Sequence, residues 1–164
     1  MEEERYILKE RRNKLEAIRN AGIDPYPSKA ERTNTNADAL KNFEKLLEKE
    51  LVLVGRIMTF RKHGKLTFAQ IEDGTGKIQI AFKENVLGDK KYKFLKNFDS
   101  GDYIQASGKL FTTKKGEKTL EVKECKILAK SLLPLPEKWH GLKDEEKRYR
   151  HRYLELLMSS DLKK

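Results

Sequence analysis

The residues of this sequence that could do chemistry lie within one short stretch, and their types suit the binding of a flat, polar ligand. An aromatic ring, Phe68, is followed by the amides Gln70 and Gln79, with the cations Arg61 and Lys77 nearby. An aromatic ring can stack on an exposed nucleic-acid base, while amides and cations hydrogen-bond to the edge of that base. The alternative is a partly solvated surface on which Phe68 packs beneath a loop. These residues alone leave both interpretations open.

Three β-rich runs within residues 51–82 would hold these side chains on one surface. Glycine-containing turns at residues 63–65 and 73–76 separate the runs, and such turns are typical of hairpin loops. Successive strand residues point to opposite sides of a sheet. The core side is therefore predicted to carry Ala69, Ile71, Ile78, Ile80 and Phe82. Phe68 and Gln79 are predicted to face the opposite way.

The elements that follow complete a recognisable order. The sequence predicts a helix over residues 85–97 and strands over residues 103–112 and 119–129, joined by a hairpin at residues 114–117. The resulting order, β-β-β-α-β-β, predicts a mainly β fold with flanking helices, built on a five-stranded OB-fold barrel. This small Greek-key barrel often binds oligonucleotides. The fold alone does not determine function.

Two helices are predicted before the barrel. Residues 2–20 combine strong helix formers with a narrow apolar stripe and many cations. The cations considered for contact with an RNA backbone are Lys9, Arg11, Arg12, Lys14 and Arg19. The helix could equally lie on the domain by its apolar stripe, and the two roles are compatible. A second helix is expected to begin near Thr35 or Asn36, either of which can cap it, and to run to Leu47.

The pattern indicates three segments: a helical extension over residues 1–50, the barrel over residues 51–130, and a linker with the start of a further domain over residues 131–164. Two prolines within residues 133–136 make a stiff connection. A helix with exposed apolar side chains is predicted over residues 144–158. Because its apolar stripe lacks a partner, we expect this helix to fray in the isolated chain.

The composition favours a polyanionic partner. Charged residues make up 38% of the 164 residues, and the formal net charge is +10. Lysine and arginine can neutralise the phosphates of a nucleic acid. The alternative is a lysine-rich surface that is merely solvated, because many of the lysines alternate with glutamates.

Several other functions are disfavoured. A single cysteine, Cys125, excludes an intrachain disulfide, and no apolar run approaches the ~20 residues that span a bilayer. The acidic N-terminus lacks the apolar run of a signal peptide, so a cytoplasmic protein with no membrane partner is expected.

No catalytic or metal-binding group is predicted. Glycine-rich phosphate loops, an HExxH motif and a nucleophile–base set are all missing from the sequence. The three histidines, His63, His140 and His151, have spacing that suits no metal site. The sequence therefore predicts a binding protein without catalytic residues or a metal.

Several short motifs occur in an arrangement that resembles a known family. They are residues 55–58, 64–65, 73–79, 101–102 and 108–111, together with Phe68. A further run passes from residues 133–136 through 140–142 to 148–154. Over essentially the whole chain from the first helix, the sequence resembles the N-terminal part of bacterial-type class II lysyl-tRNA synthetases. The last run is specific to the lysine enzymes, whereas the strand motifs also fit their aspartyl and asparaginyl relatives.

The resemblance implies a role for four residues in reading the tRNA anticodon, whose middle base is U. Phe68 matches the aromatic residue on which this base stacks, and Gln79 matches a polar residue that reads its edge. Arg61 matches a nearby cation. Glu117 matches a residue that contacts the third anticodon base.

The resemblance also implies that the chain is one part of a larger enzyme. The parent would join lysine to its tRNA with ATP and Mg²⁺, and would dimerise through a separate catalytic domain. This chain is therefore expected to be inactive and monomeric alone, with no cofactor of its own. Two alternatives stay open: a freestanding OB-fold module that binds RNA without anticodon preference, and a protein-docking barrel.

Overall fold

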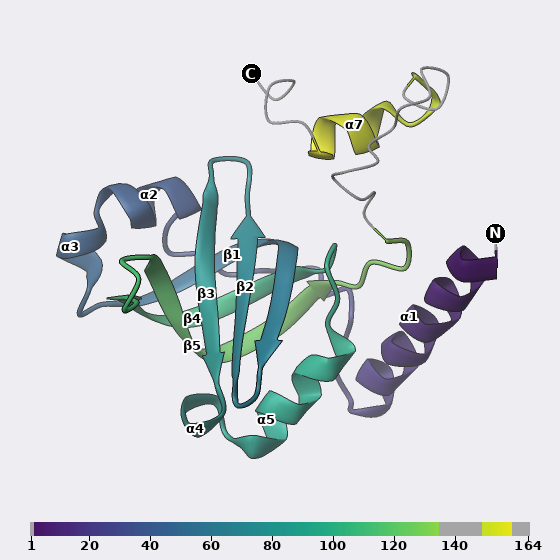
Figure 1. Ribbon diagram of the computed structural model, residues 1–164, viewed down its shortest axis with the longest axis horizontal. Helices are drawn as coiled ribbons and strands as arrows, with labels where there is room; N and C mark the ends of the chain where they lie inside the picture. Colours follow the sequence, from purple (N-terminus) through teal and green to yellow (C-terminus); the bar gives the residue numbers. More distant parts are fainter. Residues whose placement is uncertain (1, 135–148, 159–164) are drawn as a thin grey trace. The chain divides into compact units, whose positions relative to one another are not determined.

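Five strands form the centre of the fold in the computed structural model, which describes residues 2–134 and 149–158. They are β1 (Glu50–His63), β2 (Leu66–Glu72), β3 (Lys77–Lys83), β4 (Tyr103–Thr112) and β5 (Lys118–Ala129). The strands close into a barrel in the order β1-β2-β3-β5-β4, with the β1–β3 meander prominent in Figure 1. The predicted element order and the OB-fold are confirmed.

The two faces of the sheet agree with the predicted alternation. Burial alternates strictly along β2, where Ile71 is buried and Phe68 is half-buried. The five residues predicted to form the core are all buried: Ala69, Ile71, Ile78, Ile80 and Phe82. Gln79 lies half-buried on the opposite side of β3. The apolar side chains therefore fill the barrel, and Phe68 and Gln79 lie on its outside.

An irregularity in β1 determines which of its side chains face outward. Ile57 pairs with Ile71, but Thr59 pairs with Gln70, so Met58 is an additional residue in the strand. Such a β-bulge shifts the alternation by one position. Phe60 therefore points towards the core, where its ring lies 6.2 Å from that of Phe82. Arg61, the next residue, points outward.

The barrel closes where β3 and β5 run parallel and where β4 pairs with β5 antiparallel. The β4–β5 register shifts between Ser107 and Gly108, and the two backbones approach closely there. A Cβ atom at position 108 would lie 1.8 Å from the carbonyl oxygen of Glu121. Only glycine can occupy this position without moving one of the two strands.

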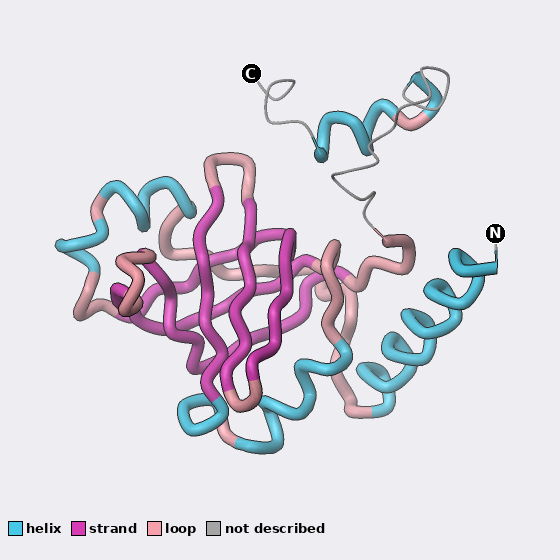
Figure 2. The backbone as a smooth tube through the Cα atoms, in the orientation of Figure 1, coloured by secondary structure: helices cyan, strands magenta, loops and turns pink. Residues whose placement is uncertain are grey.

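Short helices cover the ends of the barrel, and Figure 2 shows them in cyan beside the magenta strands. They are α2 (Asn36–Lys41), α3 (Phe43–Leu46), α4 (Glu84–Leu87), α5 (Asp89–Phe94) and the 3₁₀ helix η1 (Leu95–Asn97). Thr35 caps α2 as expected, accepting a hydrogen bond from the backbone N–H of Asp38 at 3.1 Å. The sequence predicted one continuous helix ending at Leu47 and another over residues 85–97, and both predictions are wrong. Asn42 divides the first into α2 and α3, and Gly88, at a φ of 86°, divides the second into α4 and α5.

The first helix, α1 (Glu2–Asn20), is confirmed and is anchored to the barrel domain through both apolar and charged contacts. Ile18 is fully buried in the core. The Arg11 guanidinium is buried too, and it donates hydrogen bonds of 2.9–3.2 Å to the carbonyl oxygens of Ser100, Ser131 and Leu133. Arg11 therefore holds the helix against two separate loops.

A buried ion cluster lies beside this anchor. The Lys130 ammonium, whose side chain is fully buried, contacts Asp102 at 2.9 Å and Asp99 at 2.6 Å. Asp102 also accepts backbone hydrogen bonds from Asp99 and Ser131, each at 2.8 Å. Lys14 of α1 reaches Asp99 at 2.5 Å. These contacts join the end of β5, the loop before β4 and the N-terminal helix.

The turn between β2 and β3 is organised by one carboxylate. Asp73 Oδ1 accepts hydrogen bonds from the backbone N–H groups of Thr75 and Gly76 and from the Thr75 hydroxyl. Its Oδ2 accepts from the backbone N–H of Asn36, at 3.1 Å, which ties the start of α2 to the hairpin. Burial alone would raise the pKa of Asp73, but these hydrogen bonds outweigh it and lower the pKa from its ordinary value of 3.8.

We expect Asp73→Asn to lower the free energy of unfolding by about 1–2 kcal/mol at neutral pH, because an amide cannot accept all four hydrogen bonds. A carboxyl whose folded pKa is depressed stabilises the protein above its unfolded pKa, and this contribution is lost as the pH falls through the folded value. The deficit should therefore shrink below pH 3.8. Urea unfolding of both proteins across the acid range measures it, and a deficit independent of pH would contradict the assignment.

The chain divides into two compact units, Met1–Leu133 and Pro134–Lys164. In the second, α7 (Arg152–Met158) is the described part of the helix predicted over residues 144–158. Residues 149 and 150 are helical as well, and a turn at His151 precedes α7, whereas residues 144–148 lie outside the described residues. No helix in the described ranges is long and apolar enough to cross a membrane.

Candidate nucleic-acid interface

The first row of outward side chains crosses the sheet near the β1–β2 hairpin. Arg61 of β1 pairs with Phe68 of β2, Phe68 pairs with Ala81 of β3, and Ala81 pairs with Glu121 of β5. Ala81 places only a methyl group beside Phe68. Phe68 thus lies between a cation, Arg61 on β1, and a small residue, Ala81 on β3.

A second row runs beside the first and carries polar side chains. Thr59 pairs with Gln70, Gln70 with Gln79, and Gln79 with Thr119. Adjacent rows on one face of a strand are two residues apart, so these groups are neighbours of Phe68. The structure therefore brings together the aromatic ring, the amides and Arg61 that the sequence placed on one face.

Hydrogen bonds connect Gln79 to the hairpin that carries Glu117. The Gln79 Nε2 atom donates to the Thr119 hydroxyl at 2.9 Å, and this hydroxyl donates to the Glu117 carbonyl oxygen at 3.1 Å. Gln79 and Glu117 therefore belong to one connected group. Thr119 was absent from the predicted site, although its place on the outward face follows from the alternation along β5.

The hairpin itself is closed by local hydrogen bonds. Thr113 exchanges backbone contacts with Glu117 and Gly116, and its hydroxyl accepts the Glu117 N–H at 3.1 Å. Gly116 has a φ of 83°, a conformation that glycine adopts readily. The Glu117 side chain is exposed at the end of this ordered turn.

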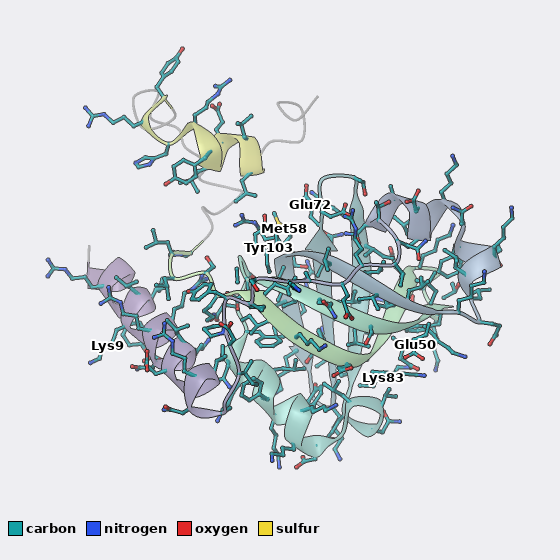
Figure 3. All side chains as sticks on the ribbon, turned by 180° about the vertical axis from the view of Figure 1, so that it is seen from behind. Lys9, Glu50, Met58, Glu72, Lys83 and Tyr103 are labelled. Carbon is teal, nitrogen blue, oxygen red and sulfur yellow. The ribbon has the colours of Figure 1, made fainter. Side chains whose placement is uncertain are left out.

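A second aromatic residue lies on the same outer face and is partly covered. Phe111 pairs with Thr119, and the Lys83 ammonium lies 4.6 Å from the centre of the Phe111 ring. Lys83, labelled in Figure 3, also forms an ion pair with Glu121. This cluster borders the site and balances the charge of Glu121. The sequence analysis gave neither residue a role in the site, although Phe111 belongs to the motif at residues 108–111.

The five cations predicted on α1 to contact RNA differ in their exposure and in the contacts they make within the chain. Lys9, labelled in Figure 3, and Arg12 are exposed. Arg19 is exposed but pairs with Glu16 at 2.8 Å, and Lys14 pairs with Asp99. Arg11 is only 8% exposed and is fully engaged with backbone carbonyls, so the prediction that it contacts an RNA backbone is corrected to a structural role.

The described residues contain no arrangement suited to metal chemistry. Within residues 2–134 and 149–158, no group of three or more His, Cys, Asp or Glu side chains could hold a metal ion. Burial raises the pKa of the Cys125 thiol, and Glu124 raises it further, so this cysteine stays protonated.

Comparison with known proteins agrees with this geometry. Residues 51–128 match the tRNA anti-codon family, which is described as an OB-fold nucleic acid binding domain. These residues cover the barrel from the start of β1 almost to the end of β5. The barrel is thus an OB-fold nucleic-acid-binding domain.

The similarity extends well beyond the barrel. The chain is 48% identical over 157 residues to the lysine–tRNA ligase of Carboxydothermus hydrogenoformans, covering 96% of this chain and 32% of the relative. It is 44% identical over 158 residues to that of Clostridium tetani, with coverages of 96% and 32%. For Thermoanaerobacter pseudethanolicus the identity is 45% over 163 residues, with coverages of 99% and 33%.

These matches support the predicted resemblance to an N-terminal anticodon-binding region of lysyl-tRNA synthetases. The chain spans about a third of the length of the curated relatives it matches. The individual roles of Phe68, Gln79, Arg61 and Glu117 stay predictions.

Proposed function

We propose that the outer face of the barrel binds the anticodon loop of a lysine tRNA, with the central U stacked on Phe68. The observation that carries the proposal is the shared face of Phe68 and Gln79, which are on adjacent paired strands and belong to neighbouring rows. A base stacked on Phe68 would present its edge to the Gln79 amide. Arg61, paired directly with Phe68, would supply a donor on the other side.

The remaining predicted residues would contact other parts of the tRNA. Glu117, on the hairpin linked to Gln79 through Thr119, would contact the neighbouring third anticodon base. Lys9 and Arg12 on α1 are exposed and would contact the tRNA backbone, whereas Lys14 and Arg19 would first have to leave their carboxylate partners. Backbone contacts of this kind strengthen binding without reading sequence.

Affinity and selectivity would come from different side chains. Stacking of one base on an aromatic ring contributes about 1–3 kcal/mol and depends little on which base it is. Discrimination requires hydrogen bonds to the base edge, because a wrong base leaves polar groups of the site unpaired. Phe68 would therefore set affinity, and Gln79 with Arg61 would set the preference for U.

We expect Phe68→Ala to weaken binding of a lysine-tRNA anticodon stem-loop by about 5- to 150-fold, which corresponds to the loss of one stacked base. Fluorescence anisotropy with this stem-loop and with a version carrying C at the central position measures both affinity and selectivity. Phe68→Tyr, which keeps an aromatic ring, is the matched control and should retain most of the affinity.

Two outcomes would contradict the proposal. Equal binding of the U and C stem-loops by the wild-type chain, falling only with added salt, would indicate a generic RNA-binding barrel. Failure to bind either stem-loop, together with binding to a partner that resists both salt and a nuclease, would instead indicate a protein-docking surface. A clear preference for U, together with weakening by Phe68→Ala, supports anticodon recognition.

We further propose how the region serves a longer protein. Residues 1–50 would act as a helical extension, residues 51–130 as the anticodon-binding domain and residues 131–164 as the connection to a catalytic domain. A protein carrying this region would be a cytoplasmic homodimer that joins lysine to tRNA with ATP and Mg²⁺. The chain spans about a third of the length of the relatives it matches, and we assign that chemistry to the parts of them that it does not match.

A further inference from the structure

The amide of Gln79 is held in one orientation by Thr119. Gln79 Nε2 donates to Thr119 Oγ1 at 2.9 Å, and the Thr119 hydroxyl donates to the Glu117 carbonyl oxygen at 3.1 Å. A backbone carbonyl can only accept, so the single hydroxyl proton of Thr119 points towards Glu117. The hydroxyl oxygen must then accept from the Gln79 amide. The nitrogen of the amide therefore faces Thr119, and Oε1 faces away from it.

Thr119 is well placed to impose this orientation. It is fully buried, and its backbone pairs with that of Gln79 in the parallel β3–β5 ladder. The Glu117 carbonyl is itself fixed, because it also accepts the backbone N–H of Thr113 at 3.0 Å. A flipped Gln79 amide would place its oxygen against the Thr119 oxygen, and the hydroxyl would have to give up its bond to Glu117 to restore a contact.

We infer that Thr119 is a positioning residue for base selectivity, because it makes Gln79 Oε1 the group that meets the base edge. This inference rests on the proposed function. Uracil carries a hydrogen-bond donor, N3–H, at the centre of its Watson–Crick edge, and cytosine carries a lone pair at the same atom. A fixed amide oxygen therefore accepts from U and repels C. A freely rotating amide would suit either base.

The test compares Thr119→Val, which removes the hydroxyl with little change of shape, with Thr119→Ser, which keeps it. For each variant of the full 164-residue chain, anisotropy gives the dissociation constants of the central-U and central-C stem-loops. We expect Thr119→Val to reduce the U-over-C preference by about 3- to 10-fold, the value of one hydrogen bond, and Thr119→Ser to restore it. A purely structural role for Thr119 would weaken both stem-loops equally and leave the ratio unchanged.

Thr67→Val is the matched control. The Thr67 hydroxyl is also buried, but it bonds to the Tyr92 hydroxyl at 2.9 Å on the interior side of β2. This variant should keep the wild-type ratio. A second measurement needs no variant: a stem-loop with N3-methyluridine at the central position should lose the advantage of U over C on the wild-type chain.

The outcomes separate the two proposals. A wild-type preference for U that survives in Thr119→Val, or undiminished binding of the N3-methyluridine stem-loop, overturns the role of Thr119 and leaves anticodon recognition standing. Equal binding of U and C by the wild type overturns the proposed function, and the role of Thr119 with it. A reduced ratio in Thr119→Val that Thr119→Ser restores supports the inference.

Discussion

Replacement of Lys130 by Met should lower the free energy of unfolding by about 3–5 kcal/mol, the cost of removing one partner from a buried ion pair. The Lys130 side chain is fully buried and contacts Asp102, which is fully buried as well. Met matches the length of the lysine stem but carries no charge. The variant would therefore leave the Asp102 carboxylate in the interior without its cation, while Asp99 would keep Lys14.

Urea unfolding monitored by circular dichroism measures this difference. Lys93→Met is the matched control, because Lys93 forms an exposed ion pair with Asp89 at 2.9 Å. Such surface pairs contribute between about 0 and 1 kcal/mol. A loss of stability in Lys130→Met no larger than that in Lys93→Met would show that the cluster does not stabilise the fold.

Replacement of Gly108 by Ala should cost about 3 kcal/mol or more, at or above the upper end of the usual range for overpacking. The added methyl group would lie 1.8 Å from the Glu121 carbonyl oxygen. This oxygen belongs to the backbone of β5, so no side-chain rotation can relieve the overlap. Either β4 or β5 must move, and the pairing that closes the barrel is disturbed.

The same substitution elsewhere in the chain provides the control. Gly74 lies in the β2–β3 turn, where an added Cβ would meet nothing within 4 Å. Gly74→Ala should therefore change stability by less than about 0.5 kcal/mol. The melting temperatures of the two variants measure the contrast. If Gly108→Ala melts with the wild type, the close approach of β4 and β5 is not a constraint in solution.

Much of the fold could be predicted from the sequence because strand alternation is a strong local signal. Ile78, Ile80 and Phe82 had to share a face, and that face is the core. The helices were harder to predict, because Gly88 and Asn42 interrupt patterns that are otherwise continuous. The bulge at Met58 has no local signature in the sequence. It lies just beyond the point where β1 changes partner, since residues 50–56 pair with β4 and residues 56–63 pair with β2.

The candidate site was predictable only in part. Phe68 and Gln79 are distinctive residue types at positions where alternation predicts exposure, so they could be identified. Thr119 carries no such signal, since its importance depends on a hydrogen bond between residues 40 positions apart. For Arg11 the sequence suggested a role that the structure does not support. A cation on a basic helix suggests an exposed charge, but Arg11 is enclosed by loops that are about 90 to 120 positions further along the sequence.

The anchoring of α1 also changes how the charge of the protein should be counted. Lys14 and Lys130 are paired with carboxylates, and Arg11 is enclosed by backbone carbonyls, so none of the three is available to contact an RNA phosphate directly. The dependence of log Kd on log salt reports the number of phosphates that are neutralised. For α1, the number of neutralised phosphates should be set by the two exposed cations Lys9 and Arg12, and not by all the basic residues of the helix. The formal charge of +10 already counts Asp99 and Asp102 against Lys14 and Lys130, so the salt dependence should follow the number of exposed cations that meet phosphates and not this net value.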